Sequence, residues 1–347
     1  MSLALPAAWL CLSAPADPSL AGLLRKVRLR ALRALLSAPA APGMTPASRA
    51  ALPRAQVALA ARAKADPEGT LAAIGAPDVL PALLCLEAGL RPAGPLLEQA
   101  LRALIDGQRS PNLPLSCGLH LAFEDSNPLR DVEAHPEKSG NALHLGGRSP
   151  QDWAEAIDAA WSVLEAALPE WTAERPSTLQ RLIPVGFDPE RHLSATYREA
   201  PGLAYLSLHP DPLTLAEALV HEGQHSRLNL LHLFDPVLEN GATTWTTSPV
   251  RPDLRPLIGV LLAVHAFVPV AALHARLAAA GHPLSQTPRF AERRRQVLAG
   301  NQRGAELIRE LGHPTRLGAR LVGELLALHD HLCALHPEGA VPAGEIV

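Results

Sequence analysis

His221 and His225 are the two residues in this sequence whose type and spacing are best suited to hold a metal ion, because they bracket an HExxH pattern. Residues four apart on an α-helix project from one face, so these two imidazoles can bind one ion. We predict a helix from Asp211 to Phe234, with Asp211 as its N-cap and Pro212 at its first position. Glu222, between the histidines, is a candidate general base on a metal-bound water. Two solvent-facing histidines and a surface glutamate are the non-functional alternative.

A mononuclear metal site needs a third protein ligand, and His265 is the preferred candidate. His265 lies in the apolar stretch from Leu257 to Leu273, where each ring nitrogen must find a partner or incur a desolvation cost. A core histidine bonded to a backbone carbonyl is the alternative. Glu239 and His274 are weaker candidates, and His232 lies too far along the helix axis.

A proline-rich segment from Thr247 to Pro256 separates the two predicted ligand helices and carries Arg251 and Arg255. Arginines held in a rigid loop can bind a carboxylate in bidentate fashion, which suits a 2-oxoacid cosubstrate. The predicted cofactor-binding residues are therefore Arg251, Arg255 and the neighbouring Ser248. The alternative is that Asp253 caps the following helix while the arginines pair with surface carboxylates.

The elements that must position these residues are mainly helices. Periodicity and proline breaks predict helices at 20–36, 48–65, 67–74, 95–105, 150–168, 211–234, 255–280, 288–311 and 316–335. Short strands are expected at 119–123, 182–186 and 204–208. The predicted fold class is α+β and predominantly α-helical, with a helical region at residues 1–110 and a metal-binding catalytic domain at 111–347.

The polar segment from Glu124 to Gly147 interrupts this apolar chain and is a candidate substrate channel. A solvated surface loop is an equally good interpretation. Its candidate channel residues are Glu133, His135, Glu137, Lys138 and Asn141.

Composition excludes several classes of partner. The chain has 347 residues, 48% of them hydrophobic and 19% charged, with a formal net charge of -3, so we expect neither nucleic-acid nor membrane binding. Four widely spaced cysteines without a CxxC pair indicate a reduced, cytoplasmic protein. The apolar start lacks a basic region, so no signal peptide is expected. Oligomeric state is not determined by these features.

Two segments of the chain carry a resemblance to a known family: Leu219–Leu231 (LVHEGQHSRLNLL) and Ser248–Phe267 (SPVRPDLRPLIGVLLAVHAF). They resemble the HExxH-motif peptide-modification proteins of ribosomal peptide natural-product pathways, also described as 2-oxoglutarate-dependent HExxH-type peptide β-hydroxylases. The resemblance covers roughly residues 127 to 331, and it includes the NPL at 127–129 and the EAHPEKSGNA at 133–142.

The resemblance implies non-haem Fe(II) held by His221, His225 and a downstream histidine, with 2-oxoglutarate and O₂ oxidising a β-carbon of a precursor peptide. Many relatives carry a Leu-His-Gly where this chain has Leu261, Leu262 and Ala263. His265, three residues beyond Leu262, can occupy nearly the same helix face. Glu222 would then position substrate or a ligand.

Two other functions remain open on the sequence. The first is a zinc metallopeptidase in which Glu222 deprotonates the metal-bound water, since imidazole suits zinc and iron alike. The second is a non-catalytic helical protein that binds a peptide through the polar segment, which predicts no stoichiometric metal.

Overall fold

The computed structural model describes residues 20–40, 44–90, 94–130, 143–173, 178–247 and 254–336. The protein is α+β and predominantly helical, which confirms the predicted fold class. The chain forms two compact units. We call Leu20–Asp158 with Pro176–Asp211 the sheet unit, and Ala159–Arg175 with Pro212–Val347 the helical unit. Residue 110 lies inside the sheet unit, and the domain boundary predicted there stays a prediction.

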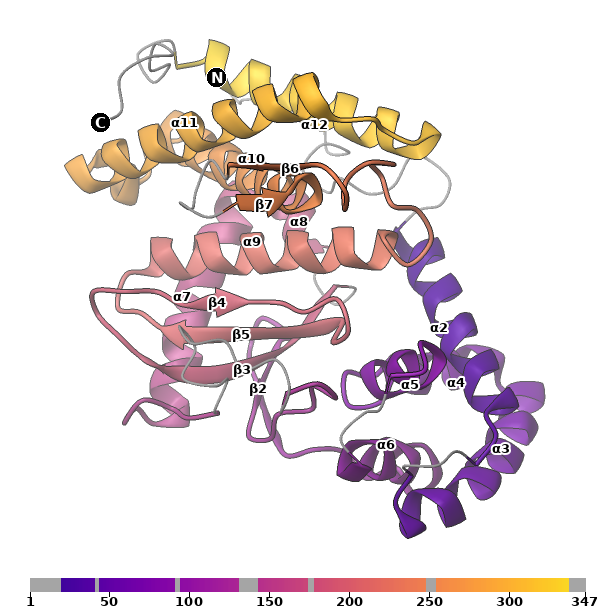
Figure 1. Cartoon of the computed structure of the whole chain (residues 1–347). Coiled ribbons are helices and arrows are strands. Elements are labelled where there is room, and N and C mark those ends of the chain that lie inside the picture. Colours follow the sequence, from indigo (N-terminus) through magenta and orange to yellow (C-terminus); the bar gives the residue numbers. More distant parts are fainter. Residues whose placement is uncertain are drawn as a thin grey trace. The chain divides into compact units, whose positions relative to one another are not determined.

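The sheet unit begins with a series of helices, some of which start at a side-chain N-cap. They are α2 (Leu20–Ser37), α3 (Pro46–Ala65), α4 (Pro67–Ile74), α5 (Leu80–Glu87) and α6 (Gly94–Asp106). The side chain of Thr45 accepts from the Ser48 amide and starts α3, and Asp66 accepts from the Gly69 amide and starts α4. All of these helices except α5 agree with the sequence prediction to within about two residues (Figure 1).

A five-stranded sheet completes the unit, in the order β1-β2-β3-β5-β4. The strands are β1 (Asn112–Pro114), β2 (His120–Ala122), β3 (Leu179–Phe187), β4 (Ser194–Ala195) and β5 (Gly202–Leu208). β2, β3 and β5 are mutually parallel and correspond to the three predicted strands, whereas the short edge strands β1 and β4 pair antiparallel and were not predicted. Every residue of β5 is buried, as expected of an inner parallel strand.

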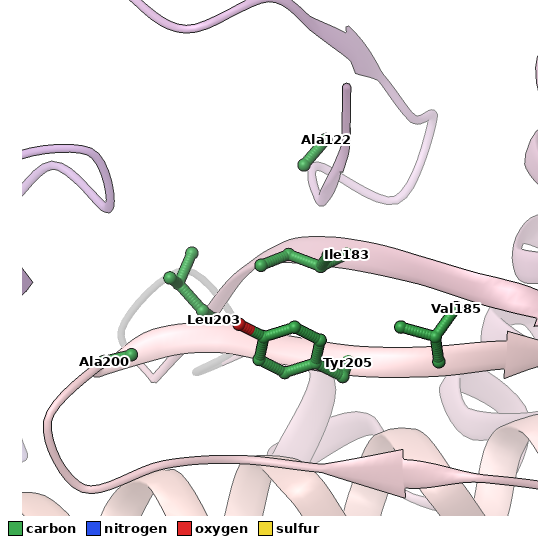
Figure 2. Close-up of a cluster of buried hydrophobic side chains, with 6 residues drawn as sticks. All are labelled: Ala122, Ile183, Val185, Ala200, Leu203 and Tyr205. Atoms are coloured by element: carbon green, nitrogen blue, oxygen red, sulfur yellow. The ribbon is translucent and has the colours of Figure 1, made fainter. Parts of the chain in front are cut away.

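A cluster of buried side chains packs on this sheet, and Figure 2 shows its six members: Ala122, Ile183, Val185, Ala200, Leu203 and Tyr205. Tyr205 is fully buried, and its hydroxyl donates a hydrogen bond of 2.8 Å to Oδ2 of Asp125. Burial and the neighbouring Asp125 carboxylate raise the pKa of Tyr205, so its hydroxyl stays protonated and remains a donor.

The helical unit is built on helices far apart in the sequence. α7 (Pro150–Ala167) begins in the sheet unit and ends in the helical unit. The remaining elements are α8 (Pro169–Ala173), α9 (Pro212–Leu231), β6 (Trp245–Thr247), β7 (Leu254–Pro256), α10 (Leu257–Ala279), the 3₁₀ helix η3 (Pro283–Gln286), α11 (Pro288–Leu311) and α12 (Arg316–Ala334). The long helices agree with the predicted ranges, and α11 has the predicted ends (Figure 1).

Helix α10 is the core of this unit and packs against α9, α11 and α12. By length and composition it is apolar enough to cross a membrane, but 72% of its most apolar window is buried inside the protein. It continues as one helix through Pro269. The packing of α9 against α10 brings the HExxH helix beside the helix that carries His265.

Candidate metal centre

The two histidines of the HExxH pattern lie side by side on α9. Their ring centroids are 4.3 Å apart, and the rings meet edge to face at 85°. Both side chains are half-buried, whereas Glu222, Gly223 and Gln224 between them are buried. The helical spacing of four residues therefore places two imidazoles on one partly accessible face.

Burial sets the charge of the His225 imidazole. It lowers the pKa of His225 to about 4, so this ring is neutral near pH 7. A neutral imidazole has the free lone pair that a metal requires. Within the described residues, Nδ1 of His225 has no hydrogen-bond partner.

His265 lies on α10 with only 1% of its surface exposed. Burial lowers its pKa well below the usual value, and electrostatic interactions with Arg227 and with the neighbouring histidines His225 and His232 lower it further. Within the described residues, Nδ1 of His265 also makes no hydrogen bond. A buried polar atom without a partner is costly, and coordination of an ion would satisfy it.

These donors do not form a preformed three-ligand centre. In the part of the chain that the structure describes, no group of three or more His, Cys, Asp or Glu side chains is placed to hold a metal. The structure brings His221 and His225 together and places His265 on a packed neighbouring helix. Glu239 lies exposed in a turn, where its amide donates to the His313 carbonyl. The donor chemistry of the histidine pair fits a metal, but within the described residues no third donor of these types is placed to complete a site with the pair.

Glu222 and its neighbours face the interior. Glu222 is 1% exposed, and Gln224 is fully buried with neither amide atom hydrogen-bonded within the described residues. Gly223 lies against Trp171 of α8, since a Cβ added there would be 2.6 Å from Cζ2 of that ring. The residues inside the HExxH pattern thus anchor α9, while His221 and His225 remain partly accessible.

A buried network one turn before His221 was not predicted. Oε1 of Glu217 lies 2.7 Å from Nε2 of His274, and its Oε2 accepts from Arg293 of α11 at 2.8 Å (Nε) and 2.7 Å (Nη2). The sequence indicated His274 only as a weaker ligand candidate. In the structure these side chains instead bind each other and tie α9, α10 and α11 together.

The charge of Glu217 depends on that network. Burial raises its pKa, but the hydrogen bonds from His274 and Arg293 and the electrostatic interactions with these two groups outweigh burial, so the net pKa is below the usual value. No local sequence signal pairs Glu217 with residues 57 and 76 positions away.

Phe267 connects this network with the histidine pair. Its ring centroid is 4.5 Å from that of His221, and the guanidinium carbon of Arg293 lies 5.8 Å from the Phe267 centroid. Phe267 therefore neighbours both the His221 imidazole and the Arg293 guanidinium.

Some predicted residues fall elsewhere. Arg255 is half-buried in β7 and pairs with Thr246 of β6 in a two-stranded hairpin. Ser248, Arg251 and the channel candidates at 133–141 lie outside the described residues. No family model matches the sequence, and no curated protein matches it either.

Proposed function

We propose that this protein is a metalloenzyme in which His221 and His225 are two metal ligands and His265 is the third. The observation that carries this proposal is the pair of adjacent, half-buried imidazoles on one face of α9. The neutral state of His225 and the unsatisfied Nδ1 of His265 support it. The proposal requires the His265 side chain to move toward the pair when the ion binds.

Within this class we propose a non-haem Fe(II)/2-oxoglutarate-dependent hydroxylase that acts on a β-carbon of a ribosomally made precursor peptide. The resemblance of residues 219–231 and 248–267 to peptide β-hydroxylases supports this choice. Iron with the oxoacid and O₂ would supply the oxidising chemistry. Ser248, Arg251 and Arg255 are proposed to bind the cosubstrate.

Two residues of the chain are proposed to orient the metal ligands and to shield them from water. Phe267 covers one side of His221 and limits water access to it. Glu222, 1% exposed, is proposed to fix the orientation of α9 and its ligands from inside the unit.

A zinc peptidase is the second candidate, favoured by the position of Glu222 directly after His221. In that case Glu222 would take a proton from the attacking water. This role needs Glu222 to reach the accessible face, whereas its carboxylate is buried in the structure.

The deciding experiment adds Fe(II) and then 2-oxoglutarate, without oxygen, to metal-free protein and records the visible charge-transfer band of a chelated iron-oxoacid complex. We expect a band in the wild type that is absent in His221→Ala. His313→Ala removes an exposed histidine elsewhere in the helical unit and should leave the band intact. His265→Ala should weaken iron binding at least about tenfold.

Absence of the band with one tightly bound zinc per chain would support the peptidase, and Glu222→Gln would then be tested against peptides. Absence of any stoichiometric metal would overturn both candidates and leave a peptide-binding protein.

A further inference from the structure

A small cavity opens between α10 and α11 beside the histidine pair. Its volume is about 50 Å³. A cavity of this size holds on the order of four water-sized groups, which matches the heavy atoms of a carboxymethyl group. The ligand that fits it is therefore the end of a small molecule, with the remainder extending outside the cavity.

One wall of the cavity is apolar and the other carries donors. Ala263, Val264 and Phe267 of α10 form the apolar wall. Helix α11 contributes Arg293 and Asn301, which lie eight residues apart on the same side of the helix. A ligand with a short aliphatic segment that ends in a polar group would pack against the apolar wall and hydrogen-bond to the donors of α11.

The side-chain amide of Asn301 is a buried donor that lacks a hydrogen-bond acceptor in the part of the chain that the structure describes. This residue is 2% exposed, and within the described residues its Nδ2 has no hydrogen-bond partner. Leaving a buried donor unsatisfied is costly, so a ligand that brings an acceptor gains affinity.

Charge favours a negatively charged acceptor. Arg293 is the one charged residue among the described lining residues, and no acidic side chain is among them. The Glu217 carboxylate binds Nε and Nη2 of Arg293, so the guanidinium is fixed in position before any ligand arrives. A carboxylate on an aliphatic stem offers acceptor oxygens and a negative charge in three heavy atoms, fewer than a sulfonate or a phosphate ester needs, and so suits the small volume.

The cavity adjoins the proposed metal ligands through one residue. Phe267 lines the cavity, and its ring lies 4.5 Å, centroid to centroid, from the ring of His221. A molecule anchored in the cavity can therefore extend along the Phe267 ring toward the imidazoles.

We infer that this cavity binds one carboxylate of a short dicarboxylic acid, with Asn301 and Arg293 as donors and Ala263, Val264 and Phe267 around its methylene groups. The inference rests on the proposed function in one respect, since it makes the acid the oxoacid cosubstrate. It places the far carboxylate in this cavity, and so replaces the role in cosubstrate binding that was proposed above for Arg251.

Binding is measured by calorimetry on metal-free, full-length protein, with succinate and 2-oxoglutarate as probes and the uncharged diamide of succinate as ligand control. We expect both acids to bind and the diamide to bind at least about tenfold more weakly. Asn301→Leu removes the donor at similar volume and should weaken both acids at least about tenfold.

Ala263→Leu fills the cavity from α10 and provides a second variant that leaves Asn301 in place. Arg295→Ala removes an exposed arginine of α11 that pairs with Glu292 and should leave acid affinity unchanged. Thermal melts of each variant separate lost binding from lost folding.

The two proposals fail in different ways. If His221→Ala loses the iron band but still binds succinate in the metal-free state, the cavity site stands on its own. If the acids bind wild type and both cavity variants equally, the cavity assignment is overturned, whatever the iron experiment shows. If Arg251→Ala abolishes acid binding and Asn301→Leu does not, the carboxylate site lies at Arg251 and the inference is wrong.

Discussion

Gly223 is the residue of the HExxH pattern whose side-chain size is most tightly restricted. A Cβ at this position would lie 2.6 Å from Cζ2 of Trp171, a ring that is itself only 1% exposed. Real Cβ contacts are longer than this, so either the ring or the helix has to shift. The glycine thus allows α9 and α8 to approach closely.

Gly223→Ala is expected to lower the free energy of unfolding. Overpacking costs about 1–3 kcal/mol, and the gain in helix propensity of about 1 kcal/mol offsets only part of it. The control is Gly323→Ala in α12, where nothing lies within 4 Å of the added Cβ. That exposed substitution should stabilise the protein by about 0.5–1 kcal/mol. Urea unfolding measures both, and a gain for both variants would contradict the tight contact with Trp171.

Tyr205 is the second residue for which we make a prediction. Its hydroxyl donates to Asp125 at 2.8 Å in a buried setting, so Tyr205→Phe should cost about 1.5–3 kcal/mol of unfolding free energy. A double-mutant cycle with Asp125→Asn isolates the coupling between the two side chains. Additive losses in the cycle would show that the hydrogen bond contributes nothing specific.

At the scale of elements, the packing of α9, α10 and α11 against one another depends on Glu217. Its carboxylate accepts from His274 and Arg293 and is 6% exposed. Removing one partner from a fully buried charged network costs on the order of 3 kcal/mol. The cost at Glu217 should be somewhat lower, because the Arg293 side chain is 40% exposed and water screens its charge. By contrast, the exposed pair of Glu292 and Arg295 should contribute about 0–1 kcal/mol.

Glu217→Gln should therefore destabilise the protein far more than the control Glu292→Gln at pH 7. Because the folded pKa of Glu217 lies below its usual value of 4.5, the stabilisation by its charge is present above that pH and is lost as the pH falls through the folded pKa. The stability difference between wild type and Glu217→Gln should shrink below about pH 4.5. A difference that is constant from pH 7 to pH 3 would rule out an ionised Glu217.

Helix α8 is joined to α10 by a further charged contact. Arg276 donates to the Ala167 carbonyl at 3.0 Å and to Oε2 of Glu170 at 2.9 Å. It thereby satisfies a carbonyl at the end of α7 and pairs with a carboxylate of α8. These contacts hold Trp171 in the position where it packs on Gly223.

At the scale of the whole molecule, metal binding should protect one unit and not the other. Both proposed ligand helices belong to the helical unit, and the sheet unit contributes none of the proposed histidines. Saturating ion at about one hundred times its dissociation constant should raise the free energy of unfolding by about 2.7 kcal/mol.

Hydrogen-exchange mass spectrometry locates this effect. We expect Fe(II) to slow exchange in 212–231 and 257–279 and to leave 179–187 and 202–208 unchanged under native conditions. His221→Ala should abolish the protection. Equal protection of the strands, or protection that survives in His221→Ala, would place the ion elsewhere.

The sequence by itself determined the helices whose signals are local. Pro67 marks the start of α4 as predicted, and the 3.6-residue period locates α9, α10 and α11, whereas the cap at Thr45 starts α3 two residues before the predicted position. The adjacency of His221 and His225 follows from the same geometry, because residues four apart always share a helix face. Helix α5 escaped prediction because its eight residues are mostly apolar and show no period.

Only the tertiary structure decided which residues meet across helices. Glu217 meets His274 and Arg293 because α9, α10 and α11 pack together, and no pattern within a helix encodes a partner 57 or 76 residues away. The same packing buries Glu222, places Phe267 on His221 and opens the cavity at Asn301. Local periodicity fixes which face of a helix is apolar, whereas side-chain packing between helices selects the neighbour and register that this face meets.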